Sequence, residues 1–82
     1  MKLEINEYLV EFDDEEQFFL KRCMQKDGNY LWKIIDDYGD TLDKIGLWQH
    51  EPFPSNRTDD YLKNNRYKFE EAIQHLQNWV DK

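Results

Sequence analysis

Apolar residues concentrate in two short runs, residues 18–25 and 30–35, which a polar segment separates. Both runs are rich in the aromatic and β-branched residues that favour strands. Asp27-Gly28 lies between them, and this dipeptide favours a tight turn because glycine accepts the positive φ that the turn requires. The sequence therefore predicts a β-hairpin over residues 18–35. A two-residue turn would set Arg22 opposite Lys33, an unfavourable like-charge pair that a three-residue turn avoids, so the register stays open.

A different spacing marks the C-terminal segment as a helix. The apolar positions there fall on one face of a helix and are Phe69, Ala72, Ile73, Leu76, Trp79 and Val80. Acidic residues at 70 and 71 suit its N-terminal end, where the helix dipole favours negative charge. A shorter helix is expected before it, with Thr58 as its N-cap and an end near Asn64-Asn65.

The remaining segments complete an α+β pattern. Residues 8–12 alternate as a strand does, although residues 5–12 also fit a helical stripe, and a further short strand is expected within 42–50. Pro52 and Pro54 exclude regular structure around them. We expect one domain over residues 1–82: an antiparallel sheet of three to four strands, with the C-terminal amphipathic helix packed on one face and the short helix before it. The pattern does not say which face the helix covers.

Composition indicates how this domain is stabilised and where in the cell it is expected. Aromatic residues make up 16% of the 82 residues, enough to build a core in a short chain. Cys23 is the only cysteine, which excludes an intrachain disulfide. Residues 1–7 carry acids where a signal peptide would be apolar, and no stretch approaches the roughly 20 apolar residues of a membrane span. We therefore expect a cytoplasmic protein without a membrane partner.

The net charge of −7 is unevenly distributed. Residues 1–43 carry 12 acidic and 5 basic side chains, whereas residues 44–82 carry six of each. Binding to a nucleic-acid backbone needs clustered lysine and arginine, so direct nucleic-acid binding is not expected. A larger, basic protein is the more compatible partner.

A meander would gather the acidic residues at one end of the sheet, because the turn before the second strand and the exit from the third lie together. The predicted acidic end consists of Asp13, Asp14, Glu15, Glu16, Asp36, Asp37, Asp40 and Asp43. One interpretation is a docking surface for a cationic site, and another is a solubilising edge that discourages aggregation. The spacing of these carboxylates does not match the helix–loop–helix calcium motif, and no metal site is expected.

The segment around the two prolines offers an alternative binding surface. Trp48, Phe53 and Arg57 lie in or beside it, and tryptophan and arginine are enriched at binding hot spots. The same residues could instead fasten the loop to the domain. A third possibility is a homodimer through a sheet face that one helix leaves uncovered.

Catalytic signals are weak. His50 beside Glu51 could serve acid–base chemistry, but adjacency in sequence does not supply the required geometry. Cys23 lies within an expected strand, and the three glycines form no phosphate-binding loop. We expect neither an enzyme nor a cofactor. The leading hypothesis is a small inhibitor or antagonist, of the physical type of phage counter-defence and immunity proteins, with mimicry of nucleic-acid charge as one form of it. The alternative is an accessory or adapter subunit that binds through apolar contact.

Overall fold

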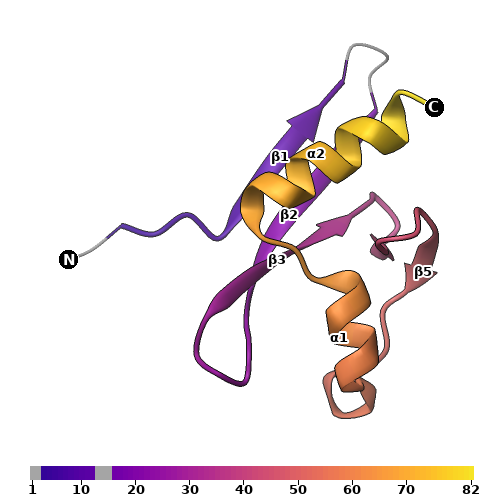
Figure 1. Cartoon of the computed structure of the whole chain (residues 1–82). Helices are drawn as coiled ribbons and strands as arrows, with labels where there is room; N and C mark the ends of the chain where they lie inside the picture. The colour runs from indigo at the N-terminus through magenta and orange to yellow at the C-terminus, as the bar shows by residue number, and fades with distance from the viewer. Residues whose placement is uncertain (1–2, 13–15) are drawn as a thin grey trace.

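Five antiparallel strands and two α-helices form the part of the chain that the computed structural model describes, residues 3–12 and 16–82 (Figure 1). The elements are β1 (Glu7–Glu11), β2 (Gln17–Met24), β3 (Tyr30–Ile35), β4 (Asp40–Leu42), β5 (Trp48–His50), the 3-10 turn η1 (Pro54–Asn56), α1 (Asp59–Asn65) and α2 (Phe69–Val80). The α+β class is confirmed. The sheet exceeds the expected three to four strands because residues 40–50 form two three-residue strands around a turn.

The strands pair in chain order as an up-and-down meander. In the β2–β3 hairpin, the amide of Gln25 donates to the carbonyl of Asn29, which leaves a three-residue turn over 26–28. Gly28 has a φ of +85°, the left-handed conformation that such a turn requires. This register sets Arg22 opposite Trp32 and Lys21 opposite Lys33. The expectation that a three-residue turn avoids a like-charge pair is therefore wrong, because a turn over 26–28 shifts the register by one residue and brings Lys21 to the position opposite Lys33.

The core lies between one face of the sheet and α2. Strand alternation and the register place Phe18, Leu20, Ile34 and Leu42 on this face, and Ala72 and Leu76 of α2 are buried with them. Phe69, Trp79 and Val80 pack against this cluster, whereas Ile73 is 40% exposed. The predicted helical stripe is therefore confirmed, with Ile73 at its margin.

The opposite face of the sheet meets the segment that includes α1. Thr41 alternates with the buried Leu42, and its hydroxyl is within hydrogen-bond distance of the Tyr61 hydroxyl. Lys33 alternates with the buried Ile34 and contacts Glu51. At the β1–β2 end of this face Leu9 is 51% exposed, so the contacts from the α1 segment leave that part of the sheet open. The predicted N-cap of α1 is confirmed, since the Thr58 hydroxyl accepts the Tyr61 amide.

Leu20 tests which face carries the core, because it is fully buried against α2. Leu20→Ala should lower the free energy of unfolding by about 2–5 kcal/mol, through lost apolar burial and the cavity that remains. Leu9→Ala, on the opposite face, is the matched control and should cost less than about 1 kcal/mol. Urea denaturation measures both. Equal losses in the two variants would contradict this assignment of faces.

Candidate functional site

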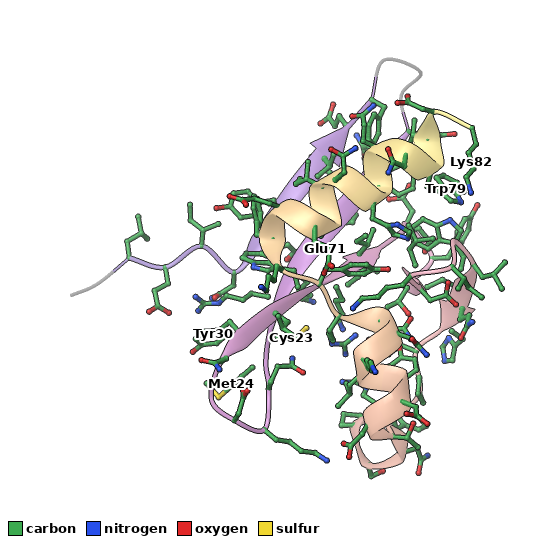
Figure 2. All side chains as sticks on the ribbon, viewed as in Figure 1. Cys23, Met24, Tyr30, Glu71, Trp79 and Lys82 are labelled. Carbon is green, nitrogen blue, oxygen red and sulfur yellow. The ribbon has the colours of Figure 1, made fainter. Side chains whose placement is uncertain are left out.

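A hollow of about 450 Å³ opens at the end of the sheet where β2 begins and β3 ends. Its lining brings together acidic and aromatic side chains from four separate segments. The lining residues are Glu16, Gln17, Phe18, Asp36, Asp37, Tyr38, Trp48 and Trp79. Figure 2 shows Trp79 near the C-terminal end of α2, far from the hairpin turn beside Met24 and Tyr30. The chain thus has an open surface depression at one end of the sheet.

Three aromatic rings form the apolar part of this hollow. The rings of Phe18 and Trp48 stack with centroids 5.6 Å apart and an interplanar angle of 13°. The Trp79 ring stands edge-on to both, with its centroid 5.9 Å from that of Phe18 and 5.5 Å from that of Trp48. Each ring belongs to a different element, so mutual packing holds them in place. Tyr38 also lines the hollow, yet its side chain is 90% exposed.

Two of the lining carboxylates have different local roles. Asp36 Oδ1 accepts the backbone amides of Tyr38 and Asp40, each at 2.9 Å, and so fixes the turn between β3 and β4. Asp37 is exposed, and its side chain makes no hydrogen bond or ion pair within residues 3–12 and 16–82. Asp36 therefore shapes the hollow, while Asp37 presents a carboxylate beside it that has no partner among the described residues.

Two other predicted acidic residues, Asp40 and Asp43, do not line the hollow. Asp13, Asp14 and Glu15 lie outside the described residues. Asp40 is half-buried, 3.9 Å from His50 Nδ1. Asp43 is buried, and its carboxylate accepts the amides of Ile45 and Leu47 and the side-chain amide of Gln49. Asp43 is consequently committed to holding the β4–β5 turn and does not face a partner.

The loop residues proposed as the alternative surface also take different positions. Trp48 packs against the core beside the hollow, as described above. Phe53 is 77% exposed just before η1. Arg57 folds back onto its own loop, where its Nε donates to the Pro52 carbonyl at 2.9 Å. Of these three side chains, Phe53 is the one that extends into solvent.

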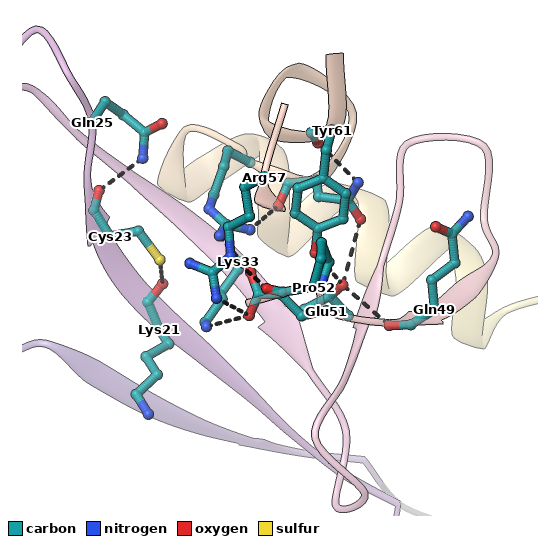
Figure 3. A network of polar contacts seen from close by, with 12 residues as sticks. Lys21, Cys23, Gln25, Lys33, Gln49, Glu51, Pro52, Arg57 and Tyr61 are labelled. Atoms are coloured by element: carbon teal, nitrogen blue, oxygen red, sulfur yellow. Dashed lines mark hydrogen bonds and ion pairs between the residues drawn. The ribbon is translucent and has the colours of Figure 1, made fainter. Parts of the chain in front are cut away.

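Glu51 organises the loop, a role that its sequence position did not reveal. Its carboxylate binds Lys33 Nζ at 2.6 Å and Arg66 Nη2, with Arg57 Nη2 at 3.4 Å (Figure 3). Glu51 and Lys33 are largely buried, and the Arg66 side chain is only 1% exposed. Burial alone would raise the pKa of Glu51, but hydrogen bonds from Lys33 and Arg66, together with their charges, lower it below its ordinary value. The loop is thus fastened to β3 and to the segment before α2 through one ionised carboxylate.

The described part of the chain contains neither a cluster of metal-binding side chains nor a helix able to span a membrane. Residues 3–12 and 16–82 contain no group of three or more histidine, cysteine, aspartate or glutamate side chains arranged to hold a metal ion. The helices in the same ranges are too short or too polar to cross a bilayer.

Comparisons with protein-family models, curated proteins and solved structures found no match. The local geometry is therefore the basis for a functional proposal.

The aromatic contribution to the hollow was not predicted. Phe18 was predicted only to lie in a strand and Trp79 on the apolar face of the C-terminal helix; Phe18 belongs to the buried core, and Trp79 is partly buried against it. No role was predicted for Tyr38. The available signal was its position directly after Asp36-Asp37, since an aromatic residue beside paired acids in an exposed turn suits a cation-binding surface.

Glu51→Gln tests the charge cluster. The variant keeps the shape of the side chain but leaves the buried Arg66 and Lys33 without their counter-charge, so it should lose about 3 kcal/mol of stability at pH 7. The folded-state pKa of Glu51 is lowered from 4.5, so its ionised form contributes stability above that pH. This contribution is lost as the pH falls through the folded-state value. The stability difference between wild type and variant should therefore shrink below about pH 4.5.

Glu70→Gln is the matched control, because Glu70 is an exposed acid in the first turn of α2. It should cost less than about 1 kcal/mol. Chemical denaturation at a series of pH values measures the three proteins. A Glu51→Gln difference that stays constant down to the acid limb would contradict an ionised, paired Glu51.

Proposed function

We propose that this protein is a small binding module that acts as an inhibitor or antagonist. It docks the end of the sheet that bears Glu16, Asp36 and Asp37, which we call the acidic end from here on, onto a basic site of a larger protein. The observation that carries the proposal is the convergence of Glu16, Asp36 and Asp37 around one hollow. Clustered like charges disfavour the folded state, and a cationic partner would turn that repulsion into attraction. A reducing, cytoplasmic setting is part of the proposal, since the single cysteine forms no disulfide.

Electrostatic docking has a characteristic dependence on salt. The Debye length falls from about 10 Å at 0.1 M to about 3 Å at 1 M salt, so charge-driven association weakens over that range. Opposite charge also raises the association rate more than the affinity of the final complex. A partner held by this surface should therefore elute as salt rises. Mimicry of nucleic-acid charge is one form of the same mechanism, in which the partner's basic site normally binds phosphates.

The test is a capture experiment with three tagged proteins. The first is wild type, and the second carries Glu16→Gln, Asp36→Asn and Asp37→Asn, in which the amide oxygen introduced at position 36 can still accept the amides that fix the turn. The third is a charge-matched control with Glu7→Gln, Asp60→Asn and Glu70→Gln, all at exposed positions away from the hollow. Each is exposed to lysate of the source cell and washed with increasing salt, and bound proteins are identified by mass spectrometry.

Wild type and control should retain the same basic protein and release it as salt rises, whereas the hollow variant should lose it by about tenfold or more. Circular dichroism verifies that the variants keep the fold. Equal capture by all three proteins, or the absence of any salt-dependent partner, would contradict the proposal.

Phe53 supports the alternative class of function, an accessory or adapter subunit. Phe53 is 77% exposed between two prolines, and phenylalanine is among the aromatic residues enriched in the cores of protein interfaces. Binding through it would persist in high salt, because apolar contact is not screened. Phe53→Ala should then abolish capture in the same experiment, and it should have little effect if the acidic end is the interface.

A further inference from the structure

Glu16, Asp36 and Asp37 line the same hollow as aromatic rings, so this end of the sheet presents more than negative charge. A purely solubilising edge would need acids alone, and apolar rings beside them would add nothing to solubility. Here the stacked rings of Phe18 and Trp48 and the perpendicular ring of Trp79 lie next to Asp36 and Asp37. This combination matches a group that is both cationic and able to pack on aromatic surface.

Arginine satisfies both conditions better than other side chains. Its guanidinium is planar and weakly hydrated, stacks on aromatic faces and pairs with carboxylates through two parallel hydrogen bonds. Tryptophan is the best aromatic partner for a cation, and two tryptophans line this hollow. Lysine carries the same charge but is a strongly hydrated point charge that loses more on leaving water.

The carboxylates leave room for such a pairing. Both hydrogen bonds to the Asp36 side chain end on Oδ1. Asp37 is exposed, with its carboxylate unpaired within the described ranges. Acceptor oxygens beside the aromatic rings therefore remain for a ligand. The hollow, with a volume of about 450 Å³, is large enough to admit a side chain.

We infer that the hollow between Asp36, Asp37 and the rings of Trp48 and Trp79 receives an arginine side chain of the partner protein, a step that rests on the proposed docking function. The carboxylates provide the charge recognition, and the aromatic rings provide the selectivity for a planar guanidinium. The partner is thereby specified more narrowly than as a basic protein: it presents an exposed arginine at the centre of the interface.

The three tryptophans allow a direct test without the partner. Uniformly ¹⁵N-labelled protein is titrated with N-acetyl-arginine amide, at constant ionic strength, while the indole N–H signals are followed by NMR. Trp48 and Trp79 line the hollow, whereas Trp32 packs with Tyr8 and Phe69 elsewhere on the sheet. We expect saturable shifts at Trp48 and Trp79 and none at Trp32.

Matched ligands separate charge from shape. N-acetyl-citrulline amide has nearly the shape of the arginine ligand but no charge, and it should bind about tenfold more weakly. N-acetyl-lysine amide keeps the charge without the planar fork, and it should also bind more weakly than the arginine ligand. Arginine and citrulline ligands that shift the same signals with equal affinity, or an arginine ligand that shifts Trp32 as much as Trp48, would overturn the inference.

Two protein variants test the carboxylates of the site and Tyr38, the exposed aromatic residue that lines the hollow beside them. Asp36→Asn combined with Asp37→Asn should weaken the binding of N-acetyl-arginine amide about tenfold. Tyr38→Ala, at a residue that is 90% exposed, should weaken this binding several-fold without loss of stability. If the Glu16, Asp36 and Asp37 variant loses its partner while arginine amide fails to shift Trp48 and Trp79, the docking function stands and the arginine site is wrong. If capture also shows no dependence on these acids, the docking function itself fails.

Discussion

The fold depends on the segment between α1 and α2, where Tyr67 pairs with the free edge of β3 and Arg66 precedes it. We call this contact the crossing, because the chain passes here from one face of the sheet to the other. β3 pairs with β4 only at Ile35 and Thr41, which leaves Trp32 open on that edge. Tyr67 occupies it, and the two residues exchange backbone hydrogen bonds of 2.7 and 2.8 Å. Because successive residues in an extended segment point to opposite sides, Arg66 faces the Glu51 cluster while Tyr67 faces the core. This crossing joins α1 and its loop to one face and α2 to the other.

Both sides of the crossing are held by buried polar contacts. Tyr67 is fully enclosed, and its hydroxyl donates to the Leu42 carbonyl at 2.8 Å. Burial, with the charges of Asp43 and Glu71 nearby, raises the pKa of Tyr67 well above its ordinary range, so the phenol remains a donor. On the opposite side Arg66 binds Glu51. Once the crossing is fixed, α2 has a defined position on the sheet, and Trp79 is brought to the end where Glu16, Asp36 and Asp37 lie.

The sequence was most informative where a local pattern decides the structure. Asp27-Gly28, Thr58 and the apolar stripe of α2 each act within a few residues, and each prediction from them was confirmed. The strands β4 and β5 have three residues each, too few to display an alternating period. Glu51 was missed because its partners Lys33 and Arg66 are distant in sequence, and only the folded chain brings the charges together. The clustering of acidic residues at the hollow could be predicted from the order of strands in a meander. The aromatic residues that line it could not, because Trp79 reaches the hollow only through the position of the end of α2.

The central claim is that the end of the sheet bearing Glu16, Asp36 and Asp37 is the docking surface. The most direct measurement is a backbone amide chemical-shift map of the ¹⁵N-labelled protein bound to the partner that it captures. The account predicts that the largest perturbations fall on residues 16–18 and 36–38 and on Trp48 and Trp79, which line the hollow. Perturbations centred instead on residues 53–57, or on the exposed face of β1 and β2 around Leu9, would contradict it.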